Sequence, residues 1–328
     1  MPMVDPFTPD AFSLNSLTAA INHLPYQPGR LGELGLFAEA GINTLDVAIE
    51  EKDGALDLVP VQPRGGTPLD VQGEKRRIRK FTVAHLLESA SILADEVQGV
   101  RAFGSENTAE TLQMRINERL AQMRRNIDYT IESHRVQAIQ GKMVDHNGDV
   151  IDLYTAFGVT QTAVTFTLSS ATAKLRQSAL DVIEAVESGL GGLPFTGIRV
   201  FCAPDFWRNF IEHDAVKGAY DRWENGAFLR SDPRAAFEYA GLIWERYRGT
   251  SQVFIPAGTA IAVPEGVPDL LITRFGPADY NETVNTIGMP YYARSEPLPM
   301  NKGWQLEAQS NPVNLCTRPQ ALIKLVAA

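Results

Sequence analysis

Histidines, the side chains most often used for acid–base catalysis and metal binding, are few in this chain and far apart. The five are His23, His85, His134, His146 and His213. His213 lies between two acidic residues, but adjacent residues of a helix do not face one another. His134 falls inside a long expected helix, where a packed histidine is the simpler interpretation. We therefore predict no catalytic acid or base, and no enzyme activity.

One group of carboxylates imitates the start of a calcium-binding loop. Asp145, Asn147 and Asp149 alternate as the first ligands of an EF-hand do. The sixth position of this loop holds valine instead of glycine, and the twelfth holds alanine instead of glutamate. Asn147-Gly148 between alternating segments favours a type I′ β-hairpin instead.

Other sequence motifs that bind metals or cofactors are missing as well. Cys202 and Cys316 are too far apart in sequence for a metal-ligand spacing or a disulfide framework, so we expect two reduced, buried thiols. The chain contains no Gly-rich phosphate loop, no His-Glu-x-x-His pair and no Gly-x-Ser-x-Gly elbow. We predict neither a metal nor a cofactor.

The composition excludes further classes. The chain has 328 residues, 44% of them hydrophobic, and a formal net charge of −9. The acidic balance argues against a dedicated nucleic-acid-binding protein, although an acidic protein can line a compartment that holds nucleic acid. The N-terminus has no signal peptide, and no apolar run approaches the roughly 18 residues of a membrane span. We expect a soluble protein made in the cytoplasm.

Residues 44–85 predict two β segments joined by a long loop. The outgoing segment begins at Thr44 and carries acidic residues, the turn lies near 63–68, and five of the six residues 75–80 are basic. Opposite charges across paired strands contribute about 0.2–1 kcal/mol per pair. Because a long two-stranded ribbon is marginal alone in water, we expect it to rest on a neighbouring copy. Binding of phosphates by the basic run is the weaker alternative, since the run is short and lacks aromatic residues.

Residues 1–43 predict an extended arm. A short amphipathic patch at 14–24 precedes a segment dense in proline and glycine, which disfavours regular structure. The apolar residues at 31–37 still need cover, so we expect the arm to lie on another surface.

The strongest helix is predicted at 108–140. Its apolar residues recur three and four apart, Asn107 with Glu110 could form a capping box, and Gly141 is a natural stop. At 1.5 Å per residue the helix would be about 50 Å long. We expect its charged faces to be solvated or to pair with neighbours; they carry Arg115, Glu118, Arg119, Arg124, Arg125, Asp128, Glu132 and Arg135.

The remainder mixes both element types. A second helix is predicted at 170–188 with Gly189 after it, a strand at 198–203, and a helix capped by Asp205 that ends near His213. Strands are predicted at 237–247, 260–263, 270–274, 304–309 and 322–326. The fold class is α+β.

The order of these parts resembles the major capsid fold of tailed bacteriophages, and several segments resemble the lambda-type capsid protein E family. They are 28–37 (PGRLGELGLF), 57–60 (DLVP) with Arg64-Gly65, 97–104 (VQGVRAFG) and 128–135 (DYTIESHR). The resemblance implies an N-terminal arm at 1–43 and an extended β-hairpin loop at 44–85. It implies a peripheral domain at 86–164 and 291–328 with a spine helix at 108–140, and an axial domain at 165–290.

The resemblance also implies a function. The chain would self-assemble as hexamers and pentamers into an icosahedral head that encloses double-stranded DNA without sequence-specific binding. It would be assembled in the host cytoplasm, with a separate scaffolding protein, a portal and, as in many such shells, a decoration protein. No catalytic residue and no cofactor transfers. We predict intersubunit contacts at Arg30, Phe37, Arg64, Arg76, Arg77 and Arg79. The alternatives are an encapsulin-like compartment shell and an ordinary cytosolic enzyme.

Overall fold

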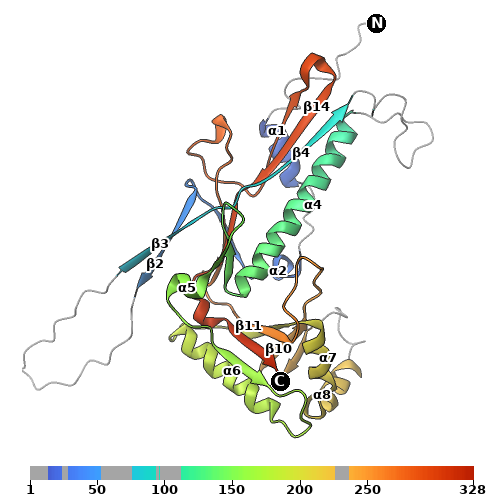
Figure 1. The fold of residues 1–328 in the computed structure, drawn as a ribbon. Helices are drawn as coiled ribbons and strands as arrows, with labels where there is room; N and C mark the ends of the chain where they lie inside the picture. The colour runs from blue at the N-terminus through green and yellow to red at the C-terminus, as the bar shows by residue number, and fades with distance from the viewer. Residues whose placement is uncertain (1–13, 24–28, 53–75, 94–95, 97–111, 226–235) are drawn as a thin grey trace, which may run out of the picture.

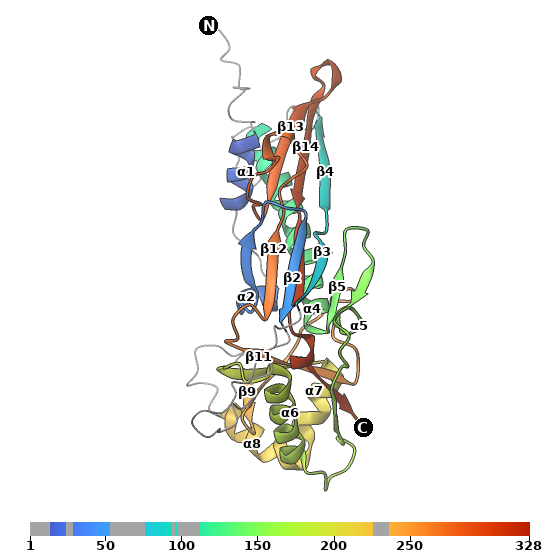
Figure 2. The same cartoon turned by 90° about the vertical axis from the view of Figure 1, so that its left-hand side faces the viewer.

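The computed structural model describes residues 14–23, 29–52, 76–93, 96, 112–225 and 236–328. Figures 1 and 2 show two parts stacked along one axis, an elongated half built on helix α4 and a compact half built on a six-stranded sheet. Mixed helices and sheets confirm the α+β class.

The compact half is a sheet covered on both faces. Its strand order is β7-β16-β11-β8-β10-β9. Helix α6 (Leu175–Leu190) buries one apolar stripe against one face, and α7 (Pro204–Glu212) and α8 (Asp214–Asn225) lie on the other side (Figure 1). The strands are β7 (Ala163–Phe166), β8 (Gly197–Cys202), β9 (Phe237–Tyr239), β10 (Leu242–Arg246), β11 (Thr259–Glu265) and β16 (Ile323–Ala327).

An aromatic stack fixes α7 to this sheet. The rings of Phe210 and Trp244 lie 4.1 Å apart, and Phe206 and Phe166 also contact the Trp244 indole. These side chains are buried, and burying each aromatic ring removes a large apolar area from water.

The elongated half surrounds the 28-residue helix α4 (Leu112–Ile139). Two three-stranded sheets, ordered β1-β12-β15 and β13-β14-β4, lie along it (Figure 2). Helix α1 (Leu14–His23) packs on β13 and α4, and α2 (Arg30–Glu33) packs on α4. The strands are β1 (Ala38–Gly41), β4 (Leu86–Leu93), β12 (Leu271–Phe275), β13 (Tyr292–Pro297), β14 (Gly303–Ser310) and β15 (Pro312–Cys316).

Smaller elements complete the chain. The antiparallel ribbon of β2 (Asp46–Lys52) and β3 (Arg76–Thr82) projects from the elongated half (Figure 1). The hairpin of β5 (Lys142–Val144) and β6 (Val150–Asp152) leads into α5 (Leu153–Phe157). Among the described residues, 3₁₀ turns lie at Asn281–Thr283, Pro299–Asn301 and Pro319–Ala321.

The long helix is confirmed where the chain is described, and so is its end. Gly141 adopts φ +76°, and a Cβ there would lie 2.1 Å from the Tyr154 ring, so glycine is required. The expected capping box at Asn107 and Glu110 lies outside the described residues.

Two expectations about helix ends are wrong. Helix α6 continues through Gly189 and stops at Gly191, which has φ +61°. Gly189 is instead a site of close approach, because a Cβ there would lie 2.4 Å from the carbonyl oxygen of Gln320. Asp205 does not cap α7; the cap position is Ala203, and the Asp205 carboxylate accepts a hydrogen bond from the Gly258 N–H at 2.5 Å.

Two turns also differ from prediction. The span 237–247 is a hairpin and not one strand, because Ala240 (φ +53°) and Gly241 (φ +80°) turn the chain between β9 and β10. The hairpin around Gly148 (φ +84°) exists but is not type I′. The Gly148 N–H donates to the Asp145 carbonyl at 3.1 Å, which is a type I turn followed by one left-handed residue.

The amphipathic patch at 14–24 finds its surface within the same subunit. Leu17 and Ile21 of α1 are buried in a core cluster with Ile127 of α4 and Tyr291 beside β13. No described helix is long and apolar enough to cross a membrane. Both cysteines are free and buried, as expected, and burial raises the pKa of Cys316 to about 12.

Replacing Ile21 with alanine should destabilise the unassembled subunit by about 2–5 kcal/mol, because a fully buried side chain leaves a cavity. Denaturant unfolding measures this loss. The exposed neighbour Ala19→Ser should change stability by about 0.5 kcal/mol or less. Equal effects of the two substitutions would show that α1 does not pack as described.

Candidate assembly interface

A row of buried charges on α4 was not expected from the sequence. Arg124, Asp128, Glu132 and Arg135 are all buried, so the prediction of solvated or neighbour-pairing charges is wrong for these four. Their spacing of three and four places them along one side of the helix. Each binds a segment far away in the sequence, which explains how charges can lie in the interior.

Glu132 holds the start of α2. Its carboxylate accepts hydrogen bonds from the Leu31 N–H at 2.8 Å, the Gly32 N–H at 3.2 Å and the Tyr247 hydroxyl at 3.0 Å. A Cβ on Gly29 would lie 2.1 Å from Glu132, so only glycine fits there. Burial and the neighbouring carboxylate raise the pKa of Tyr247 well above its usual value, which keeps its hydroxyl a donor.

A chain of alternating charges continues from α2 into the compact half. Arg30 donates to both carboxylate oxygens of Glu245 on β10, and also to Glu33 at 3.1 Å. Arg199 of β8 then binds Glu245 at 3.0 Å and Glu265 at 2.5 Å. The Arg30–Glu245 ion pair joins the two halves of the subunit, and the Arg199 pairs extend it across the compact sheet. The structure thus gives Arg30 a role inside the subunit, and its intersubunit contact stays a prediction.

The far end of α4 binds β1 in a similar way. Arg135 pairs with Glu39, lies 5.4 Å above the centre of the Phe37 ring, and donates to the Thr273 hydroxyl at 3.5 Å. Phe37 is buried in the core of the same chain. Its predicted intersubunit contact also stays a prediction.

The near end of the row binds α1. Arg124 donates to the Ile21 carbonyl oxygen, lies 4.4 Å from the centre of the Tyr291 ring, and pairs with Asp128 at 3.7 Å. The Tyr291 hydroxyl donates to Asp128. Four buried charges on one helix therefore hold α1, α2 and β1 in place through hydrogen bonds and ion pairs.

The β2–β3 ribbon has a defined backbone register. This register sets Glu51 opposite Arg77 and Lys52 opposite Arg76. The Arg79 guanidinium stacks 5.0 Å from the Phe157 ring and donates to the Phe157 carbonyl at 3.1 Å. Ile78 of β3 is 59% exposed, and Leu45 just before β2 is 58% exposed. Arg64 lies outside the described residues.

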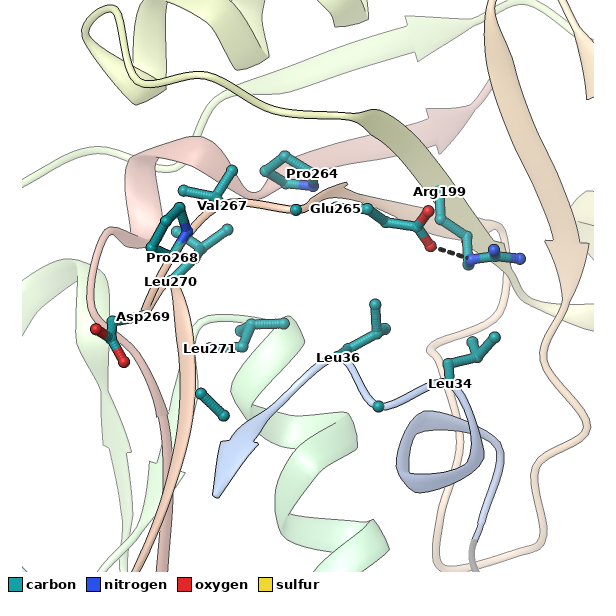
Figure 3. A pocket seen from close by; sticks show the side chains of 13 residues that line it. Leu34, Leu36, Arg199, Pro264, Glu265, Val267, Pro268, Asp269, Leu270 and Leu271 are labelled. Carbon is teal, nitrogen blue, oxygen red and sulfur yellow. Dashed lines mark hydrogen bonds and ion pairs between the residues drawn. The ribbon is translucent and has the colours of Figure 1, made fainter. Parts of the chain in front are cut away.

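A groove of about 500 Å³ lies between the segment after α2 and the turn from β11 to β12 (Figure 3). Both of its carboxylates are paired, Glu265 with Arg199 and Asp269 with Arg274 at 3.3 Å. The remaining lining is largely apolar and includes Leu34, Leu36, Val267, Leu270 and Leu271. Nothing in this lining is arranged as an acid–base pair or an activated nucleophile.

The histidines that drew attention in the sequence have structural roles. The His213 ring accepts from the Ala215 N–H at 3.2 Å through Nδ1, which leaves Nε2 to donate to the Ser170 carbonyl at 2.8 Å. His134 is buried on α4, and burial lowers its pKa to about 4. Among the described residues, no group of three metal-binding side chains comes together.

Comparison with known proteins identifies the protein family to which this chain belongs. A family model described as phage major capsid protein E matches residues 13–327. The chain therefore belongs to the phage major capsid protein E family, and it is a shell-forming protein of the virion capsid. Major capsid proteins of Pseudomonas phage KPP10 and Salmonella phage Felix O1 are similar, at 28% and 24% identity over 97% and 96% of each chain.

Solved structures confirm the fold. A phage-related protein from Bordetella bronchiseptica RB50 has a TM-score of 0.56 at 11% identity, over 96% of this chain and 98% of that chain. Capsid subunits of cyanophage P-SCSP1u and bacteriophage PhiM1 each have a TM-score of 0.51, at 12% and 14% identity. These matches cover 89% of this chain and 86% and 85% of theirs. The expected tailed-phage capsid fold is confirmed.

Glu132→Gln should release the start of α2. The glutamine side chain keeps one oxygen acceptor, but its NH₂ group then faces a backbone N–H, so two donors meet and one hydrogen bond is lost. We expect this loss to lower the folding free energy by about 1–3 kcal/mol. Hydrogen exchange at the Leu31 and Gly32 amides should accelerate. Glu118→Gln, an exposed carboxylate on the same helix, is the control and should leave exchange unchanged. Unchanged exchange in the Glu132 variant would show that this carboxylate does not hold the start of α2.

Buried His134 should make the subunit sensitive to acid. The unfolded chain takes up this proton near pH 6.5 and the folded chain only near pH 4, so the unfolded state binds more protons between these values. The contribution to stability is complete above about pH 6.5 and falls as the pH drops towards 4. His134→Gln should flatten the unfolding free energy against pH in this window, and an unchanged slope would refute the assignment.

Proposed function

We propose that this chain self-assembles as hexamers and pentamers into the icosahedral head of a phage and encloses double-stranded DNA without sequence-specific binding. The family match over residues 13–327 carries the proposal. The net charge of −9 supports it, because a wall with little attraction for DNA lets the polymer leave again. Assembly would take place in the host cytoplasm.

The subunit's own shape supports assembly with other copies. The β2–β3 ribbon projects as a two-stranded sheet (Figure 1). Leu45 just before β2 and Ile78 of β3 are exposed apolar side chains. Such a ribbon is marginal unless it rests on another surface. A neighbouring copy would supply that surface in a shell.

We propose that the chain acts without catalysis or cofactors and assembles with a separate scaffolding protein, a portal and, where present, a decoration protein. The paired carboxylates of the groove and the structural histidines support a purely structural role. An encapsulin-like compartment is the alternative, and particle contents separate the two. Electron microscopy of purified particles, with assay of nuclease-protected DNA, tests the proposal; particles that hold a cargo protein and no DNA would refute it.

The elongated half would serve as the peripheral domain, with residues 1–43 as its arm and 44–85 as the extended loop. The compact half would serve as the axial domain. Strand pairing supports placing β16 with the axial domain, because it pairs with β7 and β11, and β12 with the peripheral domain, because it pairs with β1 and β15.

Arg76→Glu separates an intersubunit role from ribbon folding. The backbone register sets Arg76 opposite Lys52, so a carboxylate at position 76 adds no like charge opposite it and should not weaken strand pairing. If Arg76 contacts a neighbour, the variant should fold with unchanged thermal stability but assemble poorly, as measured by sedimentation and microscopy. Arg77→Glu, which faces Glu51, is the comparison and should disturb the ribbon itself. Normal shells from the Arg76 variant would refute its contact role.

A further inference from the structure

Rings of identical subunits are closed by two different surfaces that meet head to tail. The proposed hexamers and pentamers therefore require two complementary faces on each copy, and the following inference rests on that proposed function. Two described surfaces carry opposite charges that remain unpaired within the subunit.

The first surface is an arginine pocket of about 260 Å³ between α2, α4 and the loop after β10, whose charged lining residues are Arg30, Arg125, Arg248 and Glu132. The buried Glu132 carboxylate is held by the backbone of α2 and by Tyr247. Arg30 is occupied by Glu245 and Glu33. Arg125 and Arg248 are exposed, and neither forms an ion pair with any residue that the structure describes.

An exposed aromatic side chain belongs to the same lining as these arginines. Tyr129 lines the arginine pocket and is 40% exposed. Phe254, the residue after Val253 in the chain, is not part of the lining but is 51% exposed. A pocket with two exposed arginines and an exposed aromatic ring suits a partner that brings carboxylates together with an apolar side chain.

The second surface is the outer face of α6. Asp181, Glu184 and Glu187 recur three residues apart on this helix, and all three are exposed. In the part of the chain that is described, none of them forms an ion pair; Asp181 only accepts a hydrogen bond from Gln177 at 3.2 Å. Leu180 stands one turn before Glu184 and is 43% exposed. We call this set the acidic face.

The two surfaces lie apart on one subunit. Figure 1 shows α6 on the left of the compact half, and Figure 2 shows it in front of the sheet, whereas α2 lies beside α4 in the elongated half. The acidic face of a copy therefore does not neutralise its own arginine pocket. Two different complementary surfaces at separate places are the requirement for a closed ring.

We propose that the acidic face of one copy docks into the arginine pocket of the next copy around the capsomer. Glu184 and Glu187 pair with Arg125 and Arg248 across this interface, and Leu180 packs against Tyr129 and Phe254. DNA phosphates could satisfy the arginines instead, but they would leave the acidic face with exposed carboxylates and an exposed leucine without a partner.

Charge exchange tests this pairing in the full-length protein. Arg125→Glu with Arg248→Glu, and separately Glu184→Arg with Glu187→Arg, should each raise the concentration needed for assembly on the order of tenfold or more, because like charges then meet at every contact of the ring. Combining all four substitutions should restore assembly. Lys302→Glu, a reversal at an exposed residue between the 3₁₀ turn at Pro299–Asn301 and β14, is the control and should assemble as the unmodified protein does. Thermal unfolding of each subunit reports whether folding is preserved.

Three results overturn the inference. Normal assembly of either double variant would show that the surface is not at an interface. A quadruple variant whose subunits fold but do not assemble would show that the surfaces do not meet. Normal shells of the arginine double variant with reduced packaged DNA would assign the arginine pocket to phosphates. If the unmodified protein itself forms no shells, the proposed function fails, which is a distinguishable outcome.

Discussion

The four buried charges of α4 are the interaction on which the subunit's architecture depends. Arg124, Asp128, Glu132 and Arg135 have been removed from water, and each is matched by a hydrogen bond or an opposite charge from another segment. Breaking such a buried contact by removing one partner is strongly unfavourable, because it leaves an uncompensated charge. The cost falls on the segment that supplies the partner, so α1, α2 and β1 each have one defined position along the helix.

The directional hydrogen bonds of these charges fix the register of the packed segments along α4. A purely apolar stripe would tolerate sliding by one turn, since hydrophobic contact is non-directional. The carboxylate of Glu132 accepts two successive backbone N–H groups, and this arrangement has a single register. Gly29 enforces the same register sterically. From there the alternating ion pairs through Arg30, Glu245 and Arg199 carry the alignment into the compact half.

Much of the fold was predictable, for identifiable reasons. The apolar stripe of α4, the alternation of β2 and the glycine at 141 are local signals, and the structure places elements where they indicated. Helix ends were less predictable because the residues near them make distant contacts. Gly189 packs closely against the backbone of Gln320, and Asp205 accepts a hydrogen bond from the Gly258 N–H. The buried charge row could not be recognised, because a mixed-sign helix face looks the same whether solvent or another segment covers it.

Residues at the proposed assembly surfaces are also hard to recognise from the sequence, because a charged side chain looks the same whether or not another segment of the chain covers it. Arg79 and Phe37 were predicted to contact a neighbouring copy, and the structure gives each of them a partner within the same chain, Phe157 and Arg135. Their contacts with another copy stay predictions. Arg125 and Glu184 have no distinguishing signal in the sequence, but both are exposed, and neither forms an ion pair with another residue in the described part of the chain. An exposed charge that the folded subunit leaves without an opposite charge is a stronger candidate for contact between copies. That criterion requires the tertiary structure, because sequence spacing shows which charges share a face and not which segment covers that face.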